Sequence, residues 1–337
     1  MFQKSPQTAD ALKSSFARQN FFAVVALFAA LLVVPFVPGV EGWMASEMSL
    51  VIIYVMAAQG VSVLTGFTGL VTVGHGGFLA IGAYTSALLT KYYGVDLLVG
   101  MLGAGFMAAL IGCVLGLVFL RLSGAFMAIG TLGFAFFVGT IVNNVPIFEG
   151  REGISLPKNH VLGLMIGDFG FYTVAVAALG VTTLMVFMLV RSSVGRAIMA
   201  LRDSEKAAES SGIDRVFYRT VAFSFSAFIT GVAGALNAHF VNYVSAEVYA
   251  DIWYSVDFLV ATVVGGSAVL MGPFIGGVFV AMVPFVFEEL ADFAFILKGV
   301  VLIGVLILAP AGIADVVARP FRALRRRRLA EARGGGV

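Results

Sequence analysis

The chain is a succession of apolar segments, most of them long enough to cross or nearly cross a lipid bilayer. Of its 337 residues, 60% are hydrophobic and only 12% are charged, which is more apolar surface than a soluble domain needs. We therefore expect an all-α, polytopic helical membrane protein with about ten transmembrane segments. Eight or nine crossings remain open, because several segments are shorter than the roughly 20 residues of a straight span. The segments are 21–37, 49–65, 77–90, 97–120, 125–143, 171–190, 220–241, 257–270, 274–287 and 294–309.

The loop charges predict which ends of these segments face the cytoplasm. With ten crossings, 17 Lys and Arg residues fall on one side and three on the other, and the basic side is expected to be cytoplasmic. Both termini are then cytoplasmic. The chain divides into a cytoplasmic N-terminal segment, 1–20, a transmembrane domain, 21–310, and a basic tail, 311–337. The tail suits anionic lipid, and we expect no nucleic-acid partner.

Residues 191–219 form a charged stretch between two apolar segments. They hold ten of the forty charged residues, six of them basic, so the stretch is expected to be a cytoplasmic loop. Asp203 or Ser204 can cap a short helix that begins with Glu205, and Gly212 suits a left-handed cap at its end.

One face of this predicted helix carries only small side chains, from Ala207, Ala208 and Ser211. Small side chains allow the surface of another protein to approach closely. The alternative is a solvated loop that contains a helical turn.

Two glycine-rich stretches, 66–84 and 265–277, interrupt the apolar pattern. Irregular backbone at membrane depth is tolerated only where protein buries it or a cavity wets it, so we predict broken or re-entrant helices beside a transport pathway, with both breaks toward the cytoplasmic side. Close helix crossings through small residues are the alternative. For His75 a hydrogen bond to a neighbouring carbonyl is the simpler role. The candidate pathway or gate residues are Gln59, Gly66, Gly69, Thr72, Gly74, His75, Gly265 and Gly266.

Several kinds of chemistry are not indicated. The single Cys113 excludes an internal disulfide, and the three histidines are too scattered to suggest a metal site. No H-E-x-x-H or G-x-S-x-G pattern indicates an enzyme, and no G-x-x-x-x-G-K-[ST] phosphate loop is present. An ion-coupled secondary transporter, the second hypothesis, normally carries paired ionisable groups within its spans, and no convincing set occurs here.

Several spaced motifs resemble the branched-chain amino-acid ABC transporter permease family, in particular its LivM-type subunit. The stretch from Gly66 is similar to G-x-x-G-x-x-S-L-G-H-A-A-F-x-x-I-G-A-Y-T, with Thr72 in place of Ser and Gly76-Gly77 in place of Ala-Ala. The central loop is similar to G-R-A-x-x-A-I-R-E-x-E-x-A-A-x-x-x-G. Residues 265–277 are similar to G-G-x-G-S-x-x-G-P-x-x-G.

This resemblance implies one permease subunit of an ATP-driven importer in a bacterial inner membrane. Its partners would be a LivH-like second permease, two LivG/LivF-like cytoplasmic ATPases that bind MgATP, and a periplasmic solute-binding protein. The outer segment 144–170 would suit that protein's docking. This chain would be a passive subunit that carries no cofactor, and its substrate would be a branched-chain amino acid, or alternatively urea, a short-chain amide or an aromatic acid. The residues placed at the ATPase contact are Arg202, Glu205, Ala207, Ala208 and Gly212.

Overall fold

A computed structural model describes most of the chain between residues 28 and 286. The described residues are 28, 30–36, 39–119, 122, 124–150, 152–249, 251–267 and 269–286, with five separate positions at 299, 303, 304, 312 and 313. The predicted N-terminal segment, most of the first apolar segment, most of the last one and most of the basic tail lie outside the described residues.

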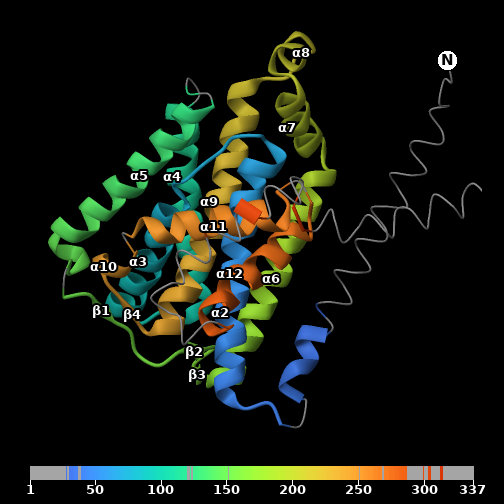
Figure 1. Ribbon diagram of the computed structural model, residues 1–337. Coiled ribbons are helices and arrows are strands. Elements are labelled where there is room, and N and C mark those ends of the chain that lie inside the picture. The colour runs from blue at the N-terminus through green and yellow to red at the C-terminus, as the bar shows by residue number, and fades with distance from the viewer. Residues whose placement is uncertain are drawn as a thin grey trace, which may run out of the picture.

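The described chain is a helical bundle (Figure 1). Each of the eight predicted apolar segments from 49–65 to 274–287 falls on a helix, so the fold class of a helical membrane protein is confirmed. The longer helices are α2 (Gly42–Val61), α3 (His75–Tyr93), α4 (Leu97–Val118), α5 (Ala125–Asn144), α6 (Asp168–Arg191), α9 (Arg215–Val241), α11 (Ile252–Gly265) and α12 (Gly272–Val286). The shorter ones are η1 (Val34–Phe36), η2 (Ser62–Phe67), η4 (Pro146–Phe148), α7 (Ser193–Asp203), α8 (Glu205–Ser210) and α10 (Ala246–Tyr249).

Six helical segments within the described ranges are long and apolar enough to cross a membrane. They are Gly42–Phe67, Leu97–Val118, Ala125–Asn144, Asp168–Arg191, Arg215–Val241 and Ala246–Gly265, and a shorter apolar helix covers Gly272–Met282. The count of ten crossings stays a prediction.

Two very short antiparallel strand pairs were not expected from the all-α pattern. β1 (Ile154–Ser155) pairs with β4 (Tyr243–Val244), and β2 (His160–Val161) pairs with β3 (Leu164–Met165). Both pairs lie at the end of the bundle opposite α8 (Figure 1). The first pair forms where the polar connection before α6 folds back onto the chain just after α9, and the second is a hairpin within that connection, so backbone groups find partners in both.

Helix α9 lies at the centre and packs against α2, α3 and α4. Its crossing with α3 has no room for side chains: a Cβ atom on Gly82 would lie 2.1 Å from the Gly231 carbonyl oxygen, and one on Gly234 would lie 2.1 Å from that of Leu79. Small residues let helix backbones approach closely where lipid gives no hydrophobic driving force between helices. The helix-crossing alternative therefore holds for Gly82, whereas the glycines before His75 lie outside regular α-helix.

The outer helices keep an apolar face uncovered. On α4 the exposed apolar side chains recur every three or four residues, as helix geometry requires for one side of a helix. In a membrane this face contacts lipid or another subunit. Its exposed members are Val99, Leu102, Phe106, Leu110, Val114 and Leu117.

Two interruptions of the helical backbone match the predicted glycine-rich breaks. The first break, residues 62–74, consists of the π-helical η2 and the irregular residues 68–74 before α3, and Gly69 there has a positive φ of 73°. The second break, residues 266–271, separates α11 from α12, and Gly266 has a φ of 105°. The broken helices are confirmed, and their re-entrant course stays a prediction.

Candidate functional site

Helix α8 forms one tip of the molecule (Figure 1) and has the predicted start and end. The Ser204 hydroxyl accepts a hydrogen bond from the Ala207 amide at 3.4 Å, which makes Ser204 the N-cap. At the other end Gly212 has a φ of 82°, and the Ile213 amide donates to the Ala208 carbonyl at 3.1 Å. Such a left-handed glycine satisfies the last carbonyls of a helix at no steric cost.

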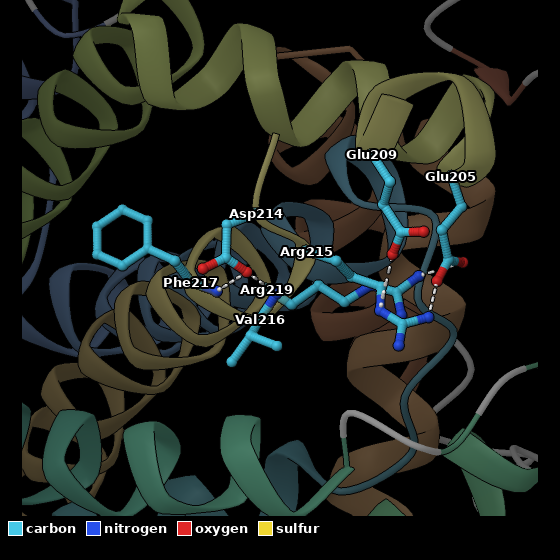
Figure 2. A network of polar contacts seen from close by, with 7 residues as sticks. All are labelled: Glu205, Glu209, Asp214, Arg215, Val216, Phe217 and Arg219. Atoms are coloured by element: carbon cyan, nitrogen blue, oxygen red, sulfur yellow. Dashed lines mark hydrogen bonds and ion pairs between the residues drawn. The ribbon is translucent and has the colours of Figure 1, made fainter. Parts of the chain in front are cut away.

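A cluster of four charged residues ties α8 to the first turns of α9 (Figure 2). We call it the Glu205 cluster, and its members are Glu205, Glu209, Arg215 and Arg219. Both carboxylate oxygens of Glu205 accept hydrogen bonds, one from Arg215 Nη1 and one from Arg219 Nη2 at 2.9 Å. Arg215 Nε also lies 3.4 Å from a Glu209 oxygen. The cluster fixes α8 against the helix at the centre of the bundle.

The charges of the cluster differ in exposure. The hydrogen bond from Arg215 and the positive charges of both arginines hold the pKa of Glu205 below its ordinary value, although partial burial works in the opposite direction. Arg219 is only 8% exposed, so its guanidinium depends on Glu205 for a charged partner. Asp214 caps α9 beside the cluster by accepting from the Val216 amide at 2.8 Å (Figure 2).

The structure corrects the predicted small-residue face of α8. Ala208 is 4% exposed, because it points back toward the protein, and it cannot contact a partner in this conformation. Ala207, Ser210 and Ser211 are exposed. The small-residue face of α8 is thus rotated from the expected one, and it lies beside the exposed Lys206 and Glu209.

Helix α7 connects this tip to the first break. Its buried residues Ala197, Ile198 and Leu201 recur at helical spacing and pack against the bundle. Arg202, in its last turn, donates from Nη1 to the Gly66 carbonyl. A Cβ atom on Gly69 would lie 3.0 Å from Arg202 Cγ, so the aliphatic part of the arginine passes directly over the break.

The two breaks touch each other. The Ser62 hydroxyl donates to the Ser267 carbonyl at 2.7 Å. Gly66 approaches the same carbonyl so closely that a Cβ atom would lie 1.7 Å from its oxygen. Gly265 packs against the start of α12, where a Cβ atom would lie 1.9 Å from the Gly272 carbonyl oxygen. Residues far apart in the sequence thus meet beside the end of α7.

Comparisons with known proteins agree with this arrangement. Residues 43–310 match the family described as "Branched-chain amino acid transport system / permease component". The chain belongs to this permease family. It is 31% identical over 331 residues to the high-affinity branched-chain amino acid transport system permease protein LivM of Escherichia coli strain K12, which covers 90% of this chain and 76% of that protein. It is 30% identical over 348 residues to the LivM protein of Salmonella typhimurium strain LT2, covering 93% and 80%. No solved structure matches the chain.

In this permease, two predicted pathway residues hold helices together. Gln59 is 2% exposed, and its Nε2 donates to the Thr183 hydroxyl at 2.7 Å, which links α2 to α6. His75 is 1% exposed, and its Nε2 lies 2.7 Å from the Ser226 hydroxyl. Because that hydroxyl donates to the Gly60 carbonyl at 2.6 Å, it accepts from the ring, which assigns the proton to Nε2. His75 thus bonds a serine, and it also interacts with the Gly60 carbonyl, which is the kind of neighbour that the sequence analysis expected.

Thr72 and Gly74 form the entry to α3 of the permease. Thr72 is 1% exposed, and the Gly74 amide lies 3.4 Å from its hydroxyl. A Cβ atom on Gly74 would lie 2.3 Å from the Thr131 carbonyl oxygen, so this glycine lets the first break pack against α5. These two predicted residues lie together with His75, whose Nδ1 is 3.4 Å from the Thr72 hydroxyl.

Sequence reasoning missed the partners of Glu205 and the contact of Arg202. A signal for the first was present, because Arg215 and Arg219 are four residues apart and share one face of α9. No comparable signal marks Ser62 and Ser267, whose contact depends on how two distant helices pack.

Proposed function

We propose that this permease is one membrane subunit of an ATP-driven importer for branched-chain or related amino acids in a bacterial inner membrane. The relatives' names specify branched-chain amino acid transport. In the proposed complex it pairs with a LivH-like permease, and together they receive substrate from a periplasmic solute-binding protein. Two cytoplasmic LivG/LivF-like ATPases bind and hydrolyse MgATP, so the energy source lies outside this chain.

The observation that carries the coupling proposal is the construction of α8. It is a short helix at one tip of the molecule with exposed small residues, and the Glu205 cluster ties it to α9. An exposed element that is rigidly joined to a central helix can receive a force from outside and pass it on. We assign the ATPase contact to Ala207 and its exposed neighbours, with Glu205, Arg202 and Gly212 holding the helix in position. Ala208 is removed from the contact.

The test is uptake of labelled leucine by proteoliposomes that contain the co-expressed complex, with ATP inside and the binding protein outside. We expect ATP-dependent uptake of the labelled leucine, and unlabelled leucine should reduce that uptake by competition. If leucine stays outside and urea or benzoate enters when ATP is present, the proposal of an ATP-driven importer is correct and the proposal of an amino acid substrate is wrong. Uptake that never depends on ATP contradicts the importer and favours an ion-coupled transporter.

The ATPase contact is tested in the same assay with Ala207→Arg. The long charged side chain should block close approach to α8 and abolish uptake. Ser193→Arg is the matched control, because it adds the same side chain at an exposed position of the same loop. Equal uptake by both variants and the unchanged chain would place the ATPase contact elsewhere.

A further inference from the structure

Three segments of the chain converge beside the end of α7: α7 itself, the first break and the second break. The hydrogen bonds between them are accepted by backbone carbonyls, that of Gly66 in one case and that of Ser267 in the other. Contacts to carbonyls in irregular backbone differ from side-chain packing, because they act directly on the course of the main chain.

Helix α7 is held firmly at its beginning. The Ser192 hydroxyl caps it by accepting from the Gly195 amide at 3.1 Å. Gly195 itself packs so tightly against the end of α6 that a Cβ atom would lie 2.1 Å from the Leu189 carbonyl oxygen. A displacement of the far end of α7 therefore tilts the helix about this tight turn.

The far end of α7 is joined to α8 through one residue. Ser204 alone separates Asp203, the last residue of α7, from Glu205, the first of α8. One residue offers little slack, so a movement of α8 also displaces the last turn of α7. Arg202 lies in that turn.

Arg202 contacts the first break in two ways. Its guanidinium donates a charge-assisted hydrogen bond to the Gly66 carbonyl, and its aliphatic part covers Gly69. Gly66 lies in η2, a π-helical turn, which is a rare backbone type found often at functional sites.

The first break passes the movement to the second. Ser62 and Gly66 both contact the Ser267 carbonyl, so the start of the second break follows the end of η2. The hydrogen bond from Ser62 is independent of α7 and can be removed separately.

We propose that Arg202 is a positioning residue that transmits the movement of α8 to both breaks of the permease. The order of contacts is α8, α7, Arg202, Gly66 and Ser267. This inference rests on the proposed function, in which an ATPase moves α8. It adds the route within this chain by which that movement reaches the interrupted helices.

The experiment compares Arg202→Ala with Arg196→Ala in the complete transporter. Arg196 is the matched control, because it is an exposed arginine of the same helix whose guanidinium also donates to a backbone carbonyl, that of Arg191. Solute uptake and ATP hydrolysis are measured on the same proteoliposomes. We expect Arg202→Ala to hydrolyse ATP and to transport at least about fivefold less solute per ATP, the lower end of typical coupling between sites. Arg196→Ala should keep the normal ratio.

Hydrogen exchange adds a readout that a purely structural role would not change. In the unchanged complex, ATP should alter exchange in 205–212, 62–74 and 266–271. In Arg202→Ala, ATP should still alter exchange in 205–212 and should no longer alter it in 62–74 and 266–271. Arg202→Lys should transport more solute per ATP than Arg202→Ala and less than the unchanged complex, because it keeps the charge and loses the planar donor.

Ser62→Ala tests the last step, and it serves also if Arg202→Ala fails to assemble. In this variant ATP should still alter hydrogen exchange in 62–74 and should no longer alter it in 266–271. A normal transport ratio in Arg202→Ala, or an unchanged response of the second break in Ser62→Ala, contradicts the relay alone. Absence of ATP-dependent uptake by the unchanged complex contradicts the proposed function, and the relay with it.

Discussion

At the scale of single residues, Glu205 links α8 to α9. Replacing it with Gln keeps its size and removes the charge that Arg215 and the buried Arg219 require. Hydrogen bonds to charged groups contribute about 1.5–3 kcal/mol, and partial exposure reduces this to about 1 kcal/mol. We expect α8 to open about fivefold more often in Glu205→Gln.

Trypsin cleavage after Lys206, followed by mass spectrometry, measures that opening, because a helix must unfold locally before it is cut. Glu209→Gln is the matched control. Its ion pair with Arg215 is longer, 3.4 Å, and its side chain is more exposed, so it should accelerate cleavage less. Cleavage of Glu205→Gln at the rate of the unchanged chain would show that the cluster does not hold α8.

The pH dependence of this contact follows from the direction of the Glu205 pKa shift. Because the pKa is lowered in the folded chain, the contact contributes fully above the ordinary pKa of a glutamate and is lost as pH falls through the lowered value. We expect protection of the α8 amides, corrected for intrinsic exchange, to be constant between about pH 6 and 8. A loss of protection centred near neutral pH would contradict this assignment.

Some of these residue-level features could be predicted from sequence and others could not. The caps of α8 follow from local chemistry, because Ser204 and Gly212 act on backbone within one turn of themselves. The burial of Ala208 could not be predicted, because it depends on the direction in which α8 leans from α9.

At the scale of elements, the α3–α9 crossing depends on glycine. In Gly82→Ala the new Cβ atom would meet the Gly231 carbonyl oxygen at 2.1 Å, and overpacking of this kind costs about 1–3 kcal/mol. We expect a lower midpoint of thermal unfolding, followed in detergent by the reaction of partly buried Cys113 with a thiol dye. Gly133→Ala is the control, because nothing lies within 4 Å of its Cβ position. Equal midpoints for the two variants would contradict the tight crossing.

The elements themselves were largely predictable. Apolar runs must be helical in lipid, and so the helices fall where the sequence places them. The breaks at 62–74 and 266–271 were predictable because the glycines within them, and Pro273 just after the second, favour irregular backbone. Their mutual contact was not, since a hydropathy pattern gives depth in the membrane and carries no information about lateral neighbours.

At the scale of the whole molecule, two ends of different character are separated by apolar helices. One end carries α8 and the Glu205 cluster, and the other carries the strand pairs β1–β4 and β2–β3 (Figure 1). The charge asymmetry of the sequence predicts that the first end faces the cytoplasm. The number of crossings is harder to predict, because α12, with 15 residues, is too short to span a bilayer as a straight helix, and α11 reaches a spanning length only together with α10.

Side-specific labelling decides the orientation on which the whole proposal depends. In a Cys113→Ala background, a cysteine replacing the exposed Leu164 of β3 should react with a membrane-impermeant maleimide in spheroplasts. A cysteine replacing Lys206 of α8 should react only after the membrane is opened. In the proposed importer the ATPases are cytoplasmic, so α8 can meet them only in this orientation. The reverse labelling pattern would leave α8 outside the cell and remove both the ATPase contact and the relay through Arg202.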